Sequence, residues 1–241
     1  MTQRTIEITS PVFADARQLD PGYDLQQLFP QQQPLALEIG CGIGDFIVQL
    51  ASAAPDTNFL AIDIYNKGCL KTCRRVERHK LSNVRVLRME ARYLLSCFGR
   101  PESLRAVYIN CPDPWPKKRH RDRRLVSTTF LTQLLYYLEP DGNLFFATDI
   151  ADYAEQVAEQ LAPIEGYLNP LGIPLMTELA GYPLSKYMRR FLELGQPIHY
   201  IHRRRRSDFQ LNADQVPRLE PGFRNRHTLN MATELSACCP D

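Results

Sequence analysis

Three glycines at alternate positions follow a short apolar stretch near the start of the chain and could bring a ligand close to the backbone. They lie within Glu38-Ile-Gly-Cys-Gly-Ile-Gly-Asp45, and glycine permits both a sharp turn and a close approach. A dinucleotide fingerprint has the spacing G-x-G-x-x-G, but here Asp45 takes the position of its third glycine. A carboxylate at the start of a helix would repel a pyrophosphate group. The pattern therefore favours a ligand without phosphates, and Glu38 suits a cationic one such as S-adenosylmethionine.

Acidic residues follow the next two apolar stretches of the chain. Asp63 lies near the end of the stretch 58–64, about 20 residues after the glycine turn, where an acid can accept both hydroxyls of a ribose. Glu90 comes directly after the stretch 84–89 and is placed to reach an adenine or its edge. Each feature alone occurs in many unrelated folds. Their order at successive strand ends favours a nucleoside-containing cofactor.

A proline-rich and basic stretch follows the fourth apolar segment, and it reads Asn110-Cys-Pro-Asp-Pro-Trp-Pro-Lys-Lys-Arg-His-Arg-Asp-Arg-Arg-Leu125. Prolines remove backbone donors and hold a chain extended, so we expect a stiff loop rather than a helix. This loop would fix Asp113 beside the cofactor pocket. It would direct the cations that follow, among them Lys117 and Arg119, outward from the sheet. Trp115 could stack on a base, although packing within the loop is the favoured interpretation.

Cations are concentrated in two blocks although the net charge of the chain is only +2. The first block is Lys117–Arg124, and the second is Arg203–Arg206 near the end of the chain. Two such blocks in a nearly neutral protein suggest an anionic partner. For either block alone, a solvated loop remains the simpler interpretation.

The elements that must position these residues alternate regularly along the chain. Strands are expected at 35–39, 58–64, 84–89, 106–110 and 142–148. Helical patterns are expected at 45–54, from the end of the second strand to about 80, through 93–95, at 125–138 and through 154–161. Repeated strand–helix units predict a parallel sheet with helices on both faces and with ligands outside the carboxyl ends of the strands. A strand at 198–201 is expected to close one edge. We therefore divide the chain into an N-terminal extension (1–34), a main domain (35–206) and a C-terminal tail of poor order (207–241).

The composition excludes several classes of protein. Of the 241 residues, 44% are hydrophobic and 23% charged, which rules out a disordered chain. No apolar run approaches the ~18 residues of a membrane span, and the first residues lack the apolar core of a secretion signal. The 7 cysteines include no Cys-x-x-Cys pair, which favours reduced thiols over a metal site. These features predict a cytoplasmic protein without a membrane or metal partner.

Three stretches of the sequence together closely resemble the tRNA (guanine-N7)-methyltransferase family. They are Glu38-Ile-Gly-Cys-Gly, Pro112-Asp-Pro-Trp-Pro-Lys-Lys-Arg-His with Arg123-Arg-Leu-Val126 just after it, and Ala147-Thr-Asp149. The proline-tryptophan-basic stretch is the most specific, whereas the glycine motif alone indicates only a methyltransferase. The likeness covers roughly residues 35–205. It implies an α/β, Rossmann-like class I methyltransferase fold with a mostly parallel seven-stranded sheet and helices on both faces.

The residues and the resemblance together assign a cofactor and a substrate. S-adenosylmethionine is expected to bind at Glu38, Gly40, Gly42, Asp63, Glu90 and Asp113, and Asp113 is also the expected catalytic residue. The partner is tRNA, bound by Lys117, Arg119, Asp149 and Ser185, and the protein would act as a monomer or homodimer. A Thr-x-x-Glu motif of the family corresponds here to Ser185-Lys-Tyr-Met188. A carboxylate is therefore missing, which bears on substrate affinity or specificity more than on catalysis.

The expected reaction needs little acid–base chemistry. N7 of guanine carries a lone pair, so the enzyme must chiefly align N7 with the methyl carbon and sulfur. The carboxylates of Asp113 and Asp149 suit the positive charge that moves onto the base, and His120 is not required as a general base. Three alternatives stay open: a methyltransferase with a different substrate, a nicotinamide dehydrogenase, and an RNA-binding methyltransferase-like protein with weak or lost catalysis.

Overall fold

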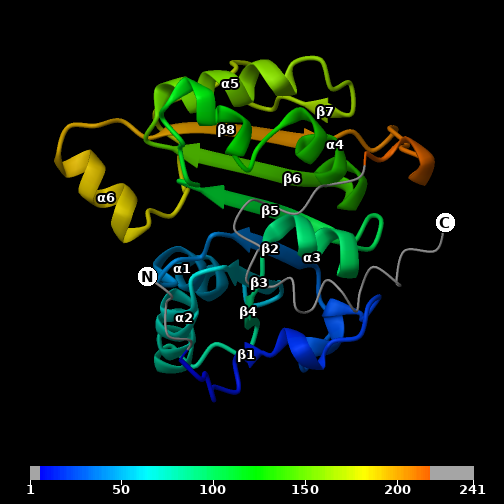
Figure 1. The fold of residues 1–241 in the computed structure, drawn as a ribbon, viewed down its shortest axis with the longest axis vertical. Helices are drawn as coiled ribbons and strands as arrows, with labels where there is room; N and C mark the ends of the chain where they lie inside the picture. Colours follow the sequence, from blue (N-terminus) through cyan, green and yellow to red (C-terminus); the bar gives the residue numbers. More distant parts are fainter. Residues whose placement is uncertain (1–5, 218–241) are drawn as a thin grey trace.

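The computed structural model describes residues 6–217, in which short strands alternate with amphipathic helices as the sequence predicts (Figure 1). The strands are β1 (Phe13–Ala14), β2 (Leu35–Ile39), β3 (Asn58–Asp63), β4 (Val84–Arg88), β5 (Leu104–Asn110), β6 (Leu138–Thr148), β7 (Tyr167–Leu168) and β8 (His199–Arg205). The α-helices are α1 (Asp45–Ala53), α2 (Asn66–Arg78), α3 (Ala91–Phe98), α4 (Thr128–Tyr137), α5 (Ala151–Leu161) and α6 (Lys186–Glu193). Short 3-10 helices lie at η1 (Ala16–Gln18), η2 (Leu25–Leu28), η3 (Lys118–Arg123) and η4 (Ala213–Gln215).

The eight strands found within residues 6–217 belong to one sheet in the order β1-β4-β3-β2-β5-β6-β8-β7. Every pairing from β1 to β6 is parallel, and β8 runs antiparallel to both β6 and β7. The mostly parallel α/β fold is confirmed, but the expected strand count of seven is wrong. Residues 199–201 of the expected edge strand belong to β8, which lies second from the edge, because the two-residue strand β7 closes that edge. Strands as short as β1 and β7 show no alternation that a sequence pattern could reveal.

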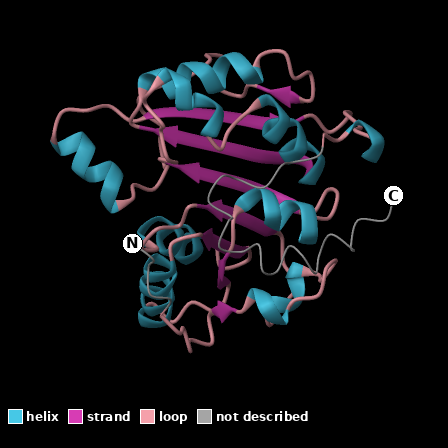
Figure 2. Ribbon diagram, in the orientation of Figure 1, coloured by secondary structure: helices cyan, strands magenta, loops and turns pink. Residues whose placement is uncertain are grey.

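Helices cover both faces of the sheet, as Figure 2 shows. On one face, Ala36 of β2 packs in a buried cluster with Ile47 of α1 and Cys69 of α2. On the other face, Leu37 of β2 and Leu94 of α3 belong to a second cluster, which α4 and α5 complete. Neighbouring strand residues join opposite clusters because side chains alternate across a strand. Within residues 6–217, no helix has the length and apolar character required to cross a membrane.

The N-terminal extension is part of this core. Val12, Leu25 and Phe29 are buried, and Phe13 and Ala14 pair with β4 at the edge of the sheet. At the other end of the chain, the backbone of Phe209 accepts a hydrogen bond from the Arg205 side chain (3.1 Å). Residues 218–241 of the C-terminal tail lie outside the described residues, so its expected poor order stays a prediction.

The chain between β7 and β8 makes a long excursion that contains α6, a helix that the sequence did not predict (Figures 1 and 2). Met188 of α6 is buried in a third apolar cluster with Ala147 of β6 and Tyr200 of β8. Tyr182, also in the excursion, contacts the ring of Phe46 on α1 at a centroid distance of 5.1 Å. In Figure 1 the arrows of β5 and β6 point toward the side of the molecule where α6 lies. The excursion therefore lies beside the carboxyl ends of these strands, where the candidate residues gather.

Candidate active site

A cavity of about 330 Å³ opens at the carboxyl ends of β2, β3, β4 and β5. Its lining includes Gly40, Asp63, Glu90, Asn110, Asp113 and Trp115. Four of the six predicted cofactor residues thus line one cavity. Because parallel strands end at the same edge of a sheet, residues distant in sequence meet here. The other two, Glu38 and Gly42, lie beside this cavity rather than on its lining.

The glycine turn adopts a backbone that other residues rarely tolerate. Gly40, Gly42 and Gly44 have φ values of 82°, 54° and 77°, all in the left-handed region. A Cβ atom on Gly44 would lie 2.7 Å from the side chain of Thr72, so α2 packs too closely for a larger residue. A Cβ on Gly40 would meet nothing within 4 Å. Gly44 therefore serves packing, whereas Gly40 leaves room for a ligand against the backbone.

Asp63 ties the glycine turn to the end of β3. Its Oδ2 accepts a hydrogen bond from the backbone of Gly42 (2.8 Å), and Oδ1 accepts one from the backbone of Tyr65 (2.8 Å). Burial raises the pKa of this carboxyl group, and the backbone donors oppose that rise. A carboxylate has about four acceptor positions, so Asp63 retains acceptor capacity beside these backbone donors. Asp63 therefore shapes the turn and can still bind a ligand.

Glu38 is a buried acid with an unsatisfied oxygen. Its side chain lies on β2 and the residue is only 2% exposed. Within the described part of the chain, neither Oε2 of Glu38 nor Nδ2 of Asn110 has a hydrogen-bond partner. Burial, and then the negative charge of Asp63, raise the pKa of Glu38 to about 8, which the nearby Asn110 side chain opposes. A buried polar atom without a partner is costly, so a ligand with a cationic donor would relieve this arrangement.

Glu90 has a structural role that the sequence did not indicate. It is the N-cap of α3, where Oε2 accepts a hydrogen bond from the backbone of Tyr93 (3.1 Å). Its other oxygen, Oε1, pairs with Arg92 (2.8 Å). Both oxygens are therefore engaged, although Glu90 lines the cavity. A cap of this kind is worth about 0.5–2 kcal/mol.

The proline-rich loop after β5 carries two residues with strained backbone and is anchored by a buried arginine. Cys111 and Trp115 have φ values of 44° and 41°, unusual for residues other than glycine. The Arg124 guanidinium donates to the carbonyl of Pro114 (2.8 Å), to Gln156 (2.5 Å) and to Asp152 (2.7 Å). This anchor holds the loop against α5. The loop in turn places Asp113 on the cavity lining with an exposed side chain.

The first basic block divides into buried and exposed cations. We expected no helix in this stretch, but Lys118–Arg123 forms the 3-10 helix η3, because only the preceding prolines hold the chain extended. Arg124 has a fully buried side chain (0% exposed), so it cannot reach a phosphate, and Arg121 pairs with Asp152. Lys117 and Arg119 are exposed, as the prediction requires.

Only half of the second basic block faces outward. The predicted contact with an anionic partner is therefore wrong for the two buried residues, Arg203 and Arg205. Arg203 and Arg205 are 5% and 3% exposed. Arg205 binds Glu102 (2.6 Å) and two backbone carbonyls. Because alternate residues of β8 face opposite sides of the sheet, only Arg204 and Arg206 of this block point away from the core.

Asp149 lies after β6, next to the cavity but not on its lining. Its carboxylate is close to the thiol of Cys111, which does line the cavity, and to the hydroxyl of Tyr187 on α6. Burial and then the charge of Asp149 raise the pKa of each of these groups to about 12. The N-cap of α5 is Ile150, without a side-chain cap. Asp149 is therefore not a helix cap, and its carboxylate lies beside Cys111 and Tyr187 instead.

Ser185 begins α6, and its hydroxyl accepts a hydrogen bond from the backbone of Met188 (3.1 Å). Met188 occupies the position where the resemblance predicts glutamate, and its side chain is fully buried in the third apolar cluster. Ser185, Lys117 and Arg119 do not line the cavity. The structure thus brings the predicted cofactor residues together and leaves the predicted tRNA residues spread around them.

Sequence reasoning missed Asn110 and Tyr182. Asn110 lines the cavity at the end of β5, and its Oδ1 accepts a hydrogen bond from the Tyr182 hydroxyl (2.7 Å). An amide at the end of an otherwise apolar strand was the available signal for Asn110. Tyr182 gave no signal, because it follows no periodic pattern. Within residues 6–217, no group of three or more His, Cys, Asp or Glu side chains is placed to hold a metal ion.

Comparison with known proteins agrees with these features. A family model described as "Putative methyltransferase" matches residues 32–201. Two relatives, both named "tRNA (guanine-N(7)-)-methyltransferase", come from Syntrophotalea carbinolica (56% identical over 230 residues) and Geobacter metallireducens (51% over 207 residues). The first match covers 95% of this chain and 99% of the relative, and the second covers 86% and 98%.

Solved structures with much lower identity share the fold. The 16S rRNA methyltransferase KamB aligns with a TM-score of 0.58 at 15% identity, over 78% of this chain and 95% of that one. A protein described as "a putative methyltransferase from streptococcus mutans in complex with SAH" aligns with a TM-score of 0.50 at 14% identity, over 75% and 93%. The Rossmann-like class I methyltransferase fold is confirmed.

Proposed function

The chain belongs to the tRNA (guanine-N7)-methyltransferase family, and from this premise we propose that it transfers a methyl group from S-adenosylmethionine to N7 of a guanine in tRNA. Its relatives of that name are 56% and 51% identical to it along nearly their whole length. Membership of this family sets aside the nicotinamide dehydrogenase and a methyltransferase for another class of substrate.

The observation that best supports the cofactor is the buried acid Glu38, whose Oε2 has no partner within the described residues. S-adenosylmethionine carries a cationic amino group and a sulfonium but no phosphate, so it suits an anionic cradle. Glu38, Gly40 and Gly42 would hold its amino-acid end, and the acceptor capacity left on Asp63 would take the ribose hydroxyls. Glu90 would border the adenine. When bound, this cofactor supplies an electrophilic methyl group.

The protein's task in this reaction is alignment. N7 of guanine needs no deprotonation, so no general base is required, and orientation can contribute up to about 7–11 kcal/mol in ideal systems. We assign Asp113 as the catalytic residue because its carboxylate lies on the cavity, where it can hold the base and offset developing positive charge. Asp149 would accept hydrogen bonds from the N1 and N2 donors of the guanine.

The rest of the tRNA would bind outside the cavity. Lys117 and Arg119 are exposed at the start of η3, directly after the loop that carries Asp113, and cations there would neutralise phosphates. The Ser185 hydroxyl accepts one hydrogen bond in the cap of α6 and can still donate its proton to substrate. The carboxylate missing at position 188 does not argue against catalysis, because Met188 faces the apolar core of the excursion.

A single assay tests this function. The purified protein is incubated with unmodified tRNA and methyl-labelled S-adenosylmethionine, and the tRNA is then digested to nucleosides. We expect label in 7-methylguanosine. Label in another nucleoside would exclude guanine N7 as the target. Absence of label despite cofactor and tRNA binding would favour an RNA-binding protein that has lost catalysis. The monomer-or-homodimer state and the cytoplasmic location stay predictions.

A further inference from the structure

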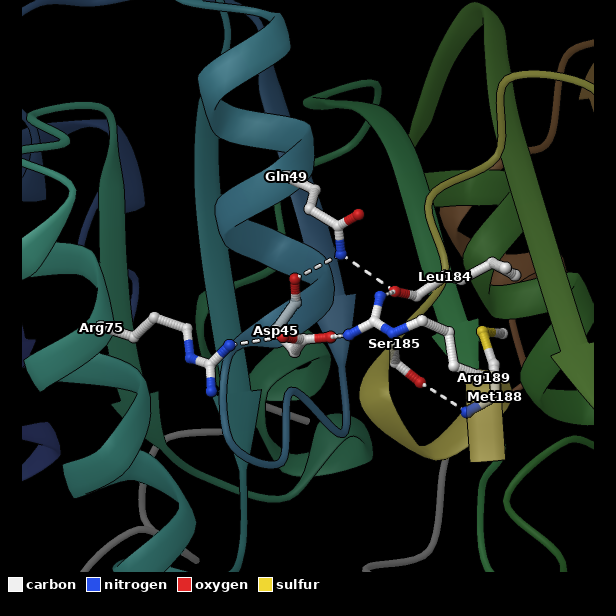
Figure 3. Close-up of polar contacts among 7 residues, drawn as sticks. All are labelled: Asp45, Gln49, Arg75, Leu184, Ser185, Met188 and Arg189. Carbon is white, nitrogen blue, oxygen red and sulfur yellow. Dashed lines mark hydrogen bonds and ion pairs between the residues drawn. The ribbon is translucent and has the colours of Figure 1, made fainter. Parts of the chain in front are cut away.

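One carboxylate connects the glycine turn to the excursion that contains α6. Asp45 is the first residue of α1, and its side chain is only 14% exposed. Oδ1 pairs with Arg75 of α2, and Oδ2 pairs with Arg189 of α6 (Figure 3). Arg189 lies 144 residues further along the chain. Asp45 therefore joins a segment of the predicted cofactor site to a segment of the predicted substrate site.

A second contact from α1 reaches the same point. The Gln49 side-chain amide donates to the carbonyl of Asp45 (2.7 Å) and to the carbonyl of Leu184 (2.9 Å), the residue just before the cap of α6 (Figure 3). Arg189 also donates to the Leu184 carbonyl (2.5 Å). Asp45, Gln49 and Arg189 thus fix the start of α6 against α1 from two directions.

The helix held in this way needs outside support. α6 has eight residues, and helices this short are not stable without tertiary contacts. Met188 is buried beneath it, but its exposed side carries Lys186, Tyr187 and Arg190. Tyr187 lies beside Asp149. The orientation of α6 about its apolar anchor therefore determines where these groups face the substrate.

We propose that Asp45 is a positioning residue that acts through Arg189 to hold α6 at the substrate side of the site. This inference rests on the proposed function, because the side in question is the one that faces tRNA. The pair does little for the stability of the whole fold, since Arg189 is 43% exposed and such ion pairs are weak. Arg75 is the matched control because it pairs with the other oxygen of the same carboxylate but belongs to α2.

The test compares three variants of the full chain: Arg189→Ala, Asp45→Asn and Arg75→Ala. For Arg189→Ala and Asp45→Asn we expect the KM for tRNA to rise by about tenfold, as misplacement of a positioning element predicts. For Arg75→Ala the KM for tRNA should stay within about twofold of the parent value. A change of this size is far smaller than the tenfold rise expected for the other two variants. The melting temperature and the affinity for S-adenosylmethionine should change little in Arg189→Ala.

A double-mutant cycle separates positioning from direct contact of Arg189 with a phosphate. If Asp45 acts through Arg189, the variant with both Asp45→Asn and Arg189→Ala should be no worse than either single variant. Additive effects, or a raised KM in Arg189→Ala without one in Asp45→Asn, would overturn the proposal. Equal effects of Arg75→Ala and Arg189→Ala would do the same, because they would indicate a role confined to α1 and α2.

Hydrogen exchange gives a readout that does not depend on activity. Amides of residues 184–193 should exchange faster in Arg189→Ala than in the parent protein, and at the parent rate in Arg75→Ala. If the parent protein methylates no tRNA, the proposed function fails while the exchange data still test the contact. Unchanged exchange in Arg189→Ala, in a protein that does methylate tRNA, would reject the positioning role alone.

Discussion

The two sides of the candidate site are built in different ways. On the cofactor side, Glu38, Asp63 and Glu90 come from the ends of successive strands, and each is largely buried. On the substrate side, Lys117 and Arg119 are exposed at the start of η3, and Asp149 and Ser185 lie around the cavity without lining it. A small ligand needs a compact, desolvated cradle, whereas a large polyanion is bound by charges spread over a surface. The comparison predicts sharp losses from single changes on the first side and graded losses on the second.

Asp113 lies at the boundary between the two sides, and its replacement should have the largest effect. Asp113→Asn keeps the size of the side chain but removes the charge that would favour a developing guanine cation. We expect kcat to fall by about 10²-fold or more, the loss typical of removing one transition-state contact. Single-turnover methylation of tRNA measures this directly.

Asp149→Asn is the matched comparison, because Asp149 is a carboxylate near the cavity but not on its lining. Its turnover should fall by about tenfold, which is about 1.4 kcal/mol. A larger loss of turnover in Asp149→Asn than in Asp113→Asn would indicate that the guanine base binds closer to Asp149 and α6 than to Asp113. Parent rates in both variants would mean that neither carboxylate serves the reaction.

Asp63→Ala should test the cofactor side more selectively. The change removes the acceptors for the backbone N–H groups of Gly42, in the glycine turn, and of Tyr65, after β3, as well as the expected ribose contact. We expect the affinity for S-adenosylmethionine to weaken by about 1.5–3 kcal/mol, as for hydrogen bonds to a charged group. Calorimetry measures the affinity, and tRNA binding without cofactor is the control. Unchanged cofactor affinity would contradict the assignment of this cavity.

The sequence predicts the cofactor side better than the substrate side for a physical reason. Apolar alternation identifies the central strands, and parallel strands bring their carboxyl ends together, so Asp63 and Glu90 could be placed on one cavity. The contact between Asp45 and Arg189 spans 144 residues and leaves no local pattern. The sequence also does not show which charged side chains are buried. Arg124 belongs to a run of cations, yet its buried side chain anchors the proline-rich loop.

Structural roles account for part of what the sequence interpreted as ligand binding. Glu90 caps α3 and pairs with Arg92, and Asp63 holds the glycine turn. Neither role could be predicted, because both depend on hydrogen bonds to backbone groups whose positions only the fold determines. Such roles do not exclude contact with a cofactor, but a substitution at either position will combine a loss of binding with a loss of local order.

The two basic blocks provide a graded test of the substrate side. Lys118→Ala with Arg119→Ala removes two exposed cations from η3 and should lower tRNA affinity at constant cofactor affinity. The slope of log affinity against log salt should become shallower by about 0.7–0.9 for each phosphate that the variant no longer neutralises.

The matched control is Arg204→Ala with Arg206→Ala, which removes the two exposed cations of the second block. These pair with Asp141 (3.6 Å) and Asp208 (2.7 Å), so their charge is already compensated. The salt slope should stay at the parent value. If the slope becomes equally shallow in the two double variants, tRNA binds to both blocks and the substrate side is wider than the site described above.

Glu38 gives the expected effect that is most specific to the cofactor side. Because its pKa is raised from 4.5 to about 8, the free protein keeps a proton on Glu38 that the unfolded chain loses at lower pH. Its contribution to the free energy of unfolding therefore declines as the pH rises between these two values.

A cationic ligand favours the carboxylate form of Glu38, so binding should release this proton. The affinity for S-adenosylmethionine should therefore increase with pH by at most about tenfold per unit. The useful range is about pH 6 to 7.5, because α-amino groups lose their own proton at about 7.7–8.0. Calorimetry in buffers of different ionisation enthalpy measures the released proton. Glu38→Gln should abolish both the proton release and the increase of affinity with pH. If both persist in Glu38→Gln, they belong to another group, and the unsatisfied Oε2 of Glu38 has no role in binding.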